Sequence, residues 1–521
     1  MLKEFSYYSQ LSRSIVKWVR SPVASSPLSA IQENIQHREA NFLQLLQAAI
    51  LANPKHPLKK LLDWAGIGYE DIEARVHRNG LEETLQELYR EGIYLTHDEF
   101  KGKQEVKRGA LVFQVASSDL ANPLYRAIME ASSSGSRGNP TITRRSLEYQ
   151  AYRELQETVF LNELELPQRE QLATTSAIPA TGGLRRLITH ARYGSPVASW
   201  MPLRPVFHYR VLTSMYLLQL RAMGIRAPFP RYLPEDDFTP IAKWIAGRKS
   251  QGKQVLVTGN VSPAVRVVAA AQELGLDISG TRFVVGGEAI TAAKVAIVEG
   301  AGALINARYT ISELGPVGFG CKHMHGNCVH LSMDALAVIA RERFAPLTDT
   351  KVQSLLFTTL LPFAPTVAIN LEMDDAGELG NSTCDCGLMQ AGYTQQINHI
   401  FSYGKLTGYG TSLMAGDVLS ILEVLLPKRF GGVPSDYQLI EQEAGKHTSI
   451  ELRVHPRLGV NSEADVRDFF LRELQRIWSG SSTGRTWSQS GGFQVRFAAP
   501  IQTNGKKIHP LHLLGSPHPR P

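Results

Sequence analysis

The sequence predicts an α/β protein with a large N-terminal domain and a small C-terminal α+β domain. Short apolar runs alternate with helical patterns between residues 254 and 306, an order that predicts parallel strands covered by helices. A shorter strand–helix–strand pattern spans residues 450–497, after a glycine-rich stretch. We therefore predict a large domain with helix-covered mixed sheets at residues 1–403, and a small mobile domain at residues 404–521, joined to it by a hinge.

Residues 1–100 predict a mainly helical first part of the large domain. Apolar residues from Phe42 to Leu51 recur at helical spacing, and a second helical pattern runs from Leu81 to Tyr89. Asn53 and Pro54 separate the two patterns, because this pair favours a turn over a continuous helix.

The alternating region begins with the apolar run Val255–Val257, which predicts a buried strand. Ser262 and Pro263 suit the start of the following helix, and Gly275 suits its end. The remaining elements follow in the same order, namely a strand at residues 282–285, a helix at 291–298 and a strand at 303–306.

The C-terminal part predicts a strand, a helix and a strand. Apolar residues alternate from Ile450 to Val454 and again from Phe493 to Phe497, as in half-buried strands. Between them, apolar residues from Val466 to Trp478 mark one face of a helix.

Composition indicates a soluble globular protein that binds no nucleic acid. Hydrophobic residues make up 43% and charged residues 20% of the 521 residues, both ordinary values for a chain with a sizeable core. The net charge of +7 is spread without a basic tract, so it suits small anionic ligands but marks no nucleic-acid surface.

The sequence predicts no membrane segment. The N-terminus has no apolar core of signal-peptide length. The most apolar stretch, Leu355–Leu371, contains Pro362 and Pro365, and we interpret it as two buried strands. We therefore expect a cytoplasmic protein.

The four cysteines form two pairs, Cys321 with Cys328 and Cys384 with Cys386. Four cysteines are too few for a disulfide scaffold in a chain of this length. Their thiolates could hold one tetrahedral zinc ion, and the neighbouring His330 could take the place of Cys328. The alternative interpretation is four reduced, buried thiols.

Residues 132–141 form a segment of small residues, Ser-Ser-Ser-Gly-Ser-Arg-Gly-Asn-Pro-Thr. Glycines let a backbone turn its N–H groups toward a phosphate, and serine hydroxyls add further donors. A flexible linker has a similar composition. The segment is not a Walker loop, because no Gly-Lys-Ser/Thr follows it.

The residue order of this segment resembles the phosphate loop of the adenylate-forming superfamily, which includes acyl-CoA synthetases and adenylation domains. Arg137 and Asn139 depart from the family pattern, so the loop's positive charge lies two residues upstream of its usual place. The positions that match are Ser133, Ser134, Gly135, Ser136, Gly138 and Pro140.

Five further segments resemble motifs of this superfamily and occur in the family's order. They are Gly286-Gly287-Glu288, Tyr309 to Glu313 (which includes Ser312), the segment around Asp375, Gly404-Lys405, and Pro500 to Lys506. The resemblance implies that Tyr309 packs on adenine, that Asp375 binds the ribose and that Glu313 holds magnesium. It also implies a catalytic Lys506 that reaches the α-phosphate of ATP, and a hinge near Lys405.

Within the superfamily the chain most resembles the phenylacetate–CoA ligase-like branch. This resemblance is carried by the stretch Pro54 to Ile72, the run Glu-Leu-Gly-Pro at 313–316, and the paired cysteines. Members of the branch hold a structural zinc ion at such cysteines. His208 falls in the region that borders the acid pocket in this family, although a purely structural role for it is slightly favoured over a substrate contact.

The resemblance implies an enzyme that uses ATP and magnesium to convert a carboxylic acid, aryl or acyl, into an acyl-AMP. A thiol then takes the acyl group, either that of CoA or the phosphopantetheine of a carrier protein. Transfer to an amine and a non-catalytic, nucleotide-binding descendant of the family are the alternatives. The identity of the acid and the formation of a homodimer stay open.

Overall fold

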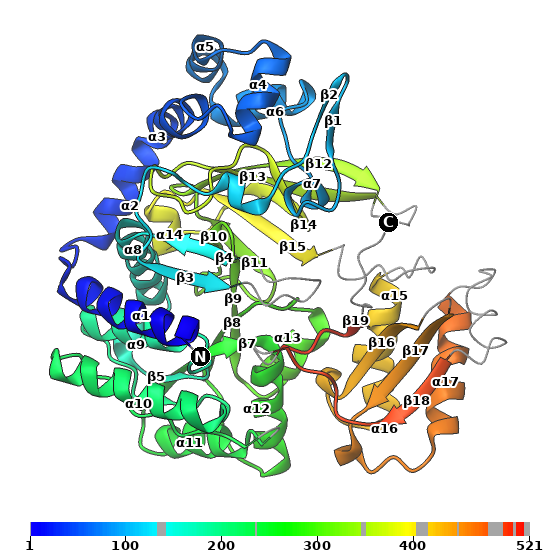
Figure 1. The fold of residues 1–521 in the computed structure, drawn as a ribbon. Coiled ribbons are helices and arrows are strands. Elements are labelled where there is room, and N and C mark those ends of the chain that lie inside the picture. Colours follow the sequence, from blue (N-terminus) through cyan, green and yellow to red (C-terminus); the bar gives the residue numbers. More distant parts are fainter. Residues whose placement is uncertain are drawn as a thin grey trace.

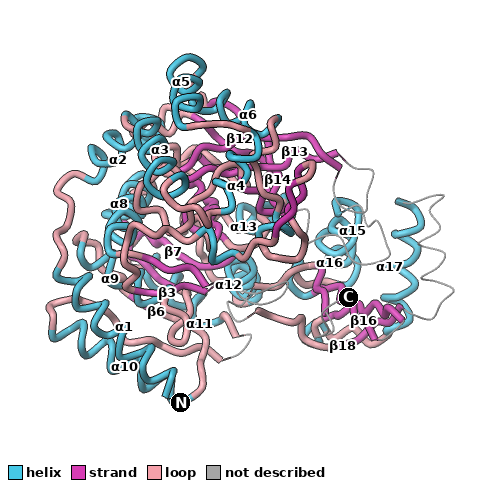
Figure 2. Tube along the Cα trace, turned by 45° about the horizontal axis from the view of Figure 1, so that its top comes forward, coloured by secondary structure: helices cyan, strands magenta, loops and turns pink. Residues whose placement is uncertain are grey.

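The computed structural model describes residues 2–132, 142–234, 237–344, 351–402, 415–444, 447–477, 493–503 and 507–514. A long central sheet runs through the larger body, and a small sheet with its own helices lies beside that body (Figure 1). Helices flank the central sheet along most of its length (Figure 2). The fold is therefore the predicted mixed α/β arrangement with a separate C-terminal sheet.

The first hundred residues are mostly helical. Buried residues of the stretch Phe42 to Ile50 pack into the main core, which is why this apolar pattern forms helix. The elements are α1 (Leu2–Arg20), α2 (Pro27–Gln36), α3 (Arg38–Leu45) with a π-helical continuation (Leu46–Leu51), α4 (Pro57–Ala65), α5 (Tyr69–Asn79), α6 (Leu81–Arg90) and α7 (His97–Phe100), followed by the hairpin β1 (Val106–Arg108) and β2 (Leu111–Phe113) and a 3-10 turn (Ser117–Leu120).

The central sheet has the strand order β12-β13-β14-β15-β11-β10-β9-β8-β7-β5-β6. Its strands are β5 (Arg169–Ala173), β6 (Ser199–Trp200), β7 (Gln254–Asn260), β8 (Arg282–Gly286), β9 (Leu304–Ile311), β10 (Gly315–Phe319), β11 (Cys328–Leu331), β12 (Leu336–Phe344), β13 (Lys351–Thr359), β14 (Leu371–Asn381) and β15 (Gln395–Ser402). The run β6-β5-β7-β8-β9 is parallel, which confirms the prediction from strand–helix alternation. From β9 through β10 to β12 the neighbours are antiparallel.

The other helices of the large domain connect these strands. They are α8 (Leu147–Glu163), α9 (Gly182–Arg192), α10 (Phe207–Ala222), α11 (Thr239–Lys249), α12 (Val261–Glu273), α13 (Ala292–Gly300) and α14 (Gly387–Gln390), with a 3-10 turn (Leu166–Gln168) and the separate hairpin β3 (Met129–Ser132) and β4 (Ile142–Arg145). The predicted start of α12 was two residues late: its N-cap is Asn260, and the Ser262 side chain bonds Glu288. Gly275 follows α12 with a positive φ of 62°, as a helix-ending glycine does.

The apolar stretch Leu355–Leu371 holds the end of β13 and the first residue of β14. Both prolines lie in the connection between the strands. No helix among the described residues is both long and apolar enough to span a membrane.

The small domain is built on a four-stranded sheet of order β18-β17-β16-β19. Its elements are α15 (Ala415–Ser420), a π-helical segment (Ile421–Leu425), α16 (Leu426–Phe430), a 3-10 turn (Pro434–Asp436), β16 (Tyr437–Ala444), β17 (His447–Val454), a second 3-10 turn (Pro456–Leu458), α17 (Glu463–Ile477), β18 (Phe493–Phe497) and β19 (Leu511–Leu514). The predicted strand–helix–strand unit is β17-α17-β18, and its two strands are parallel. Its core is separate from the main core and includes Leu452, Phe470 and Val495.

The small domain docks on α12 and α13 through charged contacts. Lys294 of α13 pairs with Glu423 of the small domain at 3.0 Å, and the exposed fraction of each side chain is only 3%. The Thr291 hydroxyl donates to the same carboxylate. Nearby, Arg266 donates to the Ser435 carbonyl oxygen at 3.2 Å. A buried pair of opposite charges therefore joins the two domains in this arrangement.

Lys294→Met is expected to release the small domain, because it leaves the buried Glu423 without its counter-charge, at a cost of about 3–5 kcal/mol. Small-angle X-ray scattering would show the release as an increased radius of gyration. The double variant Lys294→Met/Glu423→Leu removes both charges and is expected to keep the domains docked. An unchanged radius in the single variant would show that this pair does not hold the domains together.

Candidate functional site

The candidate site lies at the carboxyl ends of β7 and β8, the edge of a parallel sheet where ligands usually bind. β8 ends at Gly286, and Gly287 follows with φ of +80°, a conformation that favours glycine. Glu288 accepts hydrogen bonds from the hydroxyl and the backbone N–H of Ser262. Gly287 and Glu288, both predicted nucleotide-binding residues, therefore form a fixed turn beside the first turn of α12.

Lys507 reaches this turn from the far end of the chain. A Cβ atom placed on Gly287 would lie 2.6 Å from Cε and 2.8 Å from Nζ of Lys507, so a larger residue there would displace the end of the lysine side chain. Burial raises the pKa of Glu288, and the nearby charges of Lys294 and Lys507 partly offset this increase. The sequence prediction named only Lys506. Lys507 directly follows Lys506 in the sequence, and this neighbouring lysine was the available indication that Lys507 could act at the site.

Tyr309 and Asp375 meet across the sheet. The Tyr309 hydroxyl donates to Oδ2 of Asp375 at 2.6 Å, joining β9 to β14. Burial, and then the negative charge of Asp375, hold the pKa of Tyr309 well above its ordinary value. Tyr309 therefore stays protonated at neutral pH and remains a donor. The structure thus brings together the two residues to which the resemblance assigns adenine and ribose contacts.

Glu313 is buried and already has a cationic partner. Its Oε1 lies 2.5 Å from Nζ of Lys101, a residue that follows α7 and that the sequence analysis did not single out. The Thr366 hydroxyl donates to the backbone oxygen of Glu313. Ser312, the preceding residue, accepts at its backbone oxygen a hydrogen bond from Thr143 of β4. This contact places the β3–β4 hairpin against the candidate site.

Several predicted site residues lie outside the described residues. They are Ser133, Ser134, Gly135, Ser136 and Gly138 of the candidate phosphate loop, Lys405 near the predicted hinge, and the predicted catalytic Lys506. β3 ends at Ser132 and β4 begins at Ile142, and these two residues are paired across the hairpin. Both flanks of the candidate phosphate loop are therefore fixed next to Ser312.

A cavity of about 30 Å³ opens beside the same strand ends. Its polar lining includes Thr174, which follows β5, and Asn260, which ends β7, and its apolar lining includes Met201 and Phe238. His208 does not line this cavity. It lies in the first turn of α10 with an exposed side chain, and its ring stacks against that of Tyr209.

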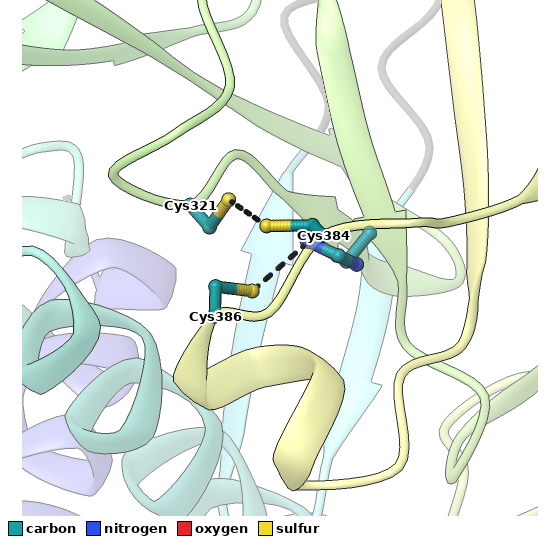
Figure 3. Close-up of side chains that lie close together, drawn as sticks. Cys321, Cys384 and Cys386 are labelled. Carbon is teal, nitrogen blue, oxygen red and sulfur yellow. Dashed lines mark hydrogen bonds between the residues drawn. The ribbon is translucent and has the colours of Figure 1, made fainter.

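Three cysteines and one histidine converge at the beginning of α14. Single ligand atoms of Cys321, His330, Cys384 and Cys386 all lie within 4.8 Å of one another. Figure 3 shows the three sulfur atoms facing one another, with Cys386 at the N-terminus of α14. Cys328, which the first interpretation included, lies outside the cluster, and its Sγ donates to Oδ1 of Asn398 instead. His330, the alternative ligand, takes that place.

The ligand atoms of the cluster are close enough together to bind one shared metal ion. Sγ of Cys321 lies 3.5 Å from Sγ of Cys384, and Sγ of Cys386 lies 3.2 Å from Nε2 of His330. The sulfur atoms are too far apart for a disulfide. Nδ1 of His330 donates to the Tyr393 carbonyl oxygen at 2.9 Å, so Nε2 keeps its lone pair toward the sulfur atoms.

The fold of the chain is similar to that of a solved CoA ligase. The chain matches the solved structure of a 2-hydroxyisobutyryl-CoA ligase in its postadenylation state, with a TM-score of 0.52 and 14% identity over 95% of this chain and 94% of that one. An open conformation of that ligase scores 0.46 at 13% identity, covering 85% and 90% of the two chains. A GH3.15 acyl acid amido synthetase scores 0.48 at 10% identity, covering 92% and 90%.

A scan against models of protein families finds no match, and a search of curated proteins finds none either. The solved structures therefore establish the class of fold, a large mixed-sheet domain with a small C-terminal domain, as found in this acyl-CoA ligase.

Proposed function

We propose that the protein activates a carboxylic acid with ATP, forming an acyl-AMP and releasing pyrophosphate, and then transfers the acyl group to a thiol. The observation that carries this proposal is the approach of Lys507 to Gly287, at the carboxyl ends of parallel strands. The chain also shares its fold with a ligase solved in a postadenylation state with R3-HIB-AMP. We assign it to the phenylacetate–CoA ligase-like branch, with an aryl or acyl acid as substrate.

In the first step an oxygen of the acid attacks the α-phosphorus of ATP, and the bond to pyrophosphate breaks. Negative charge gathers on the phosphate oxygens as this happens, so fixed positive groups lower the barrier. Lys507, and by resemblance Lys506, supplies mobile point charges of this kind. The backbone N–H groups of Ser133 to Gly138 are the proposed donors to the phosphates, with Gly287 and Glu288 forming the facing turn.

Tyr309 and Asp375 are proposed to hold the nucleoside. Their 2.6 Å hydrogen bond fixes the two side chains relative to each other before a ligand arrives. A carboxylate accepts hydrogen bonds from both ribose hydroxyls, and an aromatic ring offers adenine a flat apolar surface. Orienting the nucleotide in this way aligns the α-phosphate with the acid.

Glu313 is the proposed ligand for the magnesium ion that accompanies ATP. Carboxylate oxygens suit this ion, which neutralises phosphate charge when it is bound. In the structure Lys101 pairs with Glu313 at 2.5 Å, so the ammonium competes with the cation for this carboxylate. Ser312 contributes its backbone contact with Thr143, which keeps the β3–β4 hairpin near Glu313.

The second step is attack of a thiol on the acyl-AMP, which expels AMP. CoA and the phosphopantetheine of a carrier protein are the proposed acceptors. Rotation of the small domain about a hinge near Lys405 would withdraw Lys507 from Gly287 and open the site. Such a rotation must also break the buried Lys294–Glu423 pair.

We further propose that Cys321, His330, Cys384 and Cys386 hold a structural zinc ion. Three sulfur ligands and one imidazole nitrogen fill a tetrahedral site and leave no open position for chemistry. The cluster connects β11, through His330, with the segment before α14. Its proposed role is therefore to fix these segments.

Exchange of labelled pyrophosphate into ATP over a panel of aryl and acyl acids tests the first step. We expect exchange with at least one acid. We also expect Asp375→Asn to lower kcat/KM for ATP by about 10- to 100-fold, because it removes a charged acceptor worth about 1.5–3 kcal/mol.

The control for this substitution is Asp277→Asn, since Asp277 is an exposed aspartate that pairs with Lys249 away from the site. It should leave exchange unchanged. Absence of exchange with every acid, together with tight ATP binding, would instead support a nucleotide-binding protein without turnover.

A further inference from the structure

A cluster of arginines gathers where α8, α9, β4 and β9 meet. Arg153 lies on α8, Arg185 and Arg186 lie at the start of α9, and Arg145 and Arg308 lie on β4 and β9. Arg153 and Arg186 are each only 5% exposed. Burial lowers the pKa of Arg153 well below its ordinary value, and the charges of its arginine neighbours lower it further.

Glu157 of α8 is the carboxylate at the centre of this cluster. Its oxygens lie 2.8 Å from Arg185, 2.9 Å from Arg186 and 3.1 Å from Arg308. Burial by itself raises the pKa of Glu157, but the three guanidinium groups more than reverse this, so that its pKa lies well below the ordinary value. Glu157 is therefore ionised and shared among three cations.

The cluster carries more positive than negative charge. Within the described residues no carboxylate pairs with Arg145 or Arg153, and the Nε atom of each is buried without a hydrogen-bond acceptor. The other nearby carboxylate, Glu154, is already paired with Arg192 at 3.1 Å. Among the described residues, Glu157 is therefore the carboxylate paired with the cluster, through Arg185, Arg186 and Arg308.

An excess of buried positive charge is unfavourable unless an anion compensates for it. Guanidinium groups are planar forks that bind carboxylate or phosphate oxygens in pairs. Several of them around one point suit an anion with more than one charge.

The cluster lies close to the proposed nucleotide site but on the other face of the sheet. Arg308 and Tyr309 are successive residues of β9, so their side chains point to opposite faces. Tyr309 reaches Asp375 on one face, whereas Arg308 reaches Glu157 of α8 on the other. In the parallel register of β8 and β9, Arg308 lies opposite Gly286, the residue before the Gly287 turn. A ligand in the cluster would thus lie beside the phosphates without occupying the nucleoside position.

We propose that this arginine cluster binds a multiply charged oxyanion, and that the anion belongs to the acid substrate. The proposal rests on the function inferred above. The enzyme would then activate one carboxylate of an acid that carries at least one further carboxylate or phosphate group.

Thermal melting and calorimetric titration of the full-length protein test this site. The probes are tricarballylate as a multivalent carboxylate, benzoate as a monovalent one, inorganic pyrophosphate and ATP. We expect saturable stabilisation by tricarballylate and not by benzoate. Arg153→Met should weaken tricarballylate binding by about 10- to 100-fold, the loss expected for one charged hydrogen bond.

Arg153→Met should also melt, without ligand, at or above the wild-type temperature, because it removes an uncompensated buried charge. Arg169→Met is the matched control: Arg169 has a 7% exposed side chain but its own partner, Glu165, at 3.1 Å. That variant should bind tricarballylate as the wild type does.

The assignment to the acid would be overturned if only pyrophosphate or ATP stabilised the wild type and Arg153→Met abolished that stabilisation. Absence of saturable stabilisation by any multivalent anion would overturn the site itself. Pyrophosphate exchange, measured in parallel, separates these outcomes from failure of the proposed function. Suppose that an acid with no charged group besides its reacting carboxylate supports exchange, and that Arg153→Met leaves this exchange unchanged. The proposed function would then stand, and the inference about the arginine cluster would be refuted.

Discussion

Lys507→Ala is expected to lower acid-dependent ATP–pyrophosphate exchange by about 100- to 1000-fold, the usual loss when one group that stabilises transition-state charge is removed. The structure places Lys507 against Gly287, whereas the resemblance assigns the same role to Lys506. Because Lys507 lies outside any helix or strand and its side chain is only partly buried, the melting temperature should change little. Measurement of kcat for exchange, with melting as the folding control, provides the check.

Comparison of Lys506→Ala with Lys507→Ala decides between the two lysines. We expect the larger loss in Lys507→Ala. If Lys506→Ala alone abolishes exchange, the motif alignment is right, and the contact of Lys507 with Gly287 has no catalytic role. If neither variant loses exchange, the assignment of this segment to the active site is wrong.

Gly287→Ala offers an independent check on the same contact. The added Cβ would meet Lys507 at under 3 Å, and the φ of +80° disfavours alanine. The Gly287→Ala variant should therefore lose exchange activity, as Lys507→Ala does. Gly300→Ala is the control, because a Cβ at this helical glycine meets nothing within 4 Å.

Cys386→Ser is expected to produce the second large effect, loss of bound zinc and of much of the large domain's stability. Zinc coordination in small domains contributes about 10–16 kcal/mol, so even a part of this exceeds ordinary mutational effects. Metal analysis should find about one zinc per wild-type chain. The variant should hold less zinc and melt at a clearly lower temperature.

Cys328→Ser is the control for this prediction, because Cys328 lies outside the cluster and bonds Asn398 instead. It should retain zinc and melt near the wild-type temperature. If Cys328→Ser lost zinc and His330→Ala kept it, the four cysteines would be the ligands. Wild-type protein purified without chelators that lacks zinc would refute the site.

Local pattern was sufficient for much of the fold. The order of strands and helices from Val255 to Asn306 follows from apolar periodicity, since each element buries one face or stripe of its own residues. The parallel pairing of β7, β8 and β9 then follows from the helices that connect them. The N-cap of α12 was missed because Ser262, a suitable cap by sequence, instead bonds Glu288 from the next loop.

Pairings between distant segments could not be predicted in the same way. Lys101 precedes Glu313 by a large part of the chain, and no local rule connects the two residues. The choice of His330 over Cys328 depends on position along β11, because residues two apart on a strand share a face. The register with β15 places Cys328 opposite Asn398, whereas Nε2 of His330 lies 3.2 Å from Sγ of Cys386. Spacing in the sequence permits both ligands, and only the sheet excludes one of them.

The sequence by itself determined the two-domain α/β plan and the segments that resemble nucleotide-binding motifs, because periodicity, turn residues and motif order are local properties. The tertiary structure decided which charges meet. It brought Lys507 to Gly287, paired Lys101 with Glu313, and placed three arginines around Glu157. Electrostatic energy depends on distance in space and on burial, and both are fixed only when the sheet and its helices are assembled.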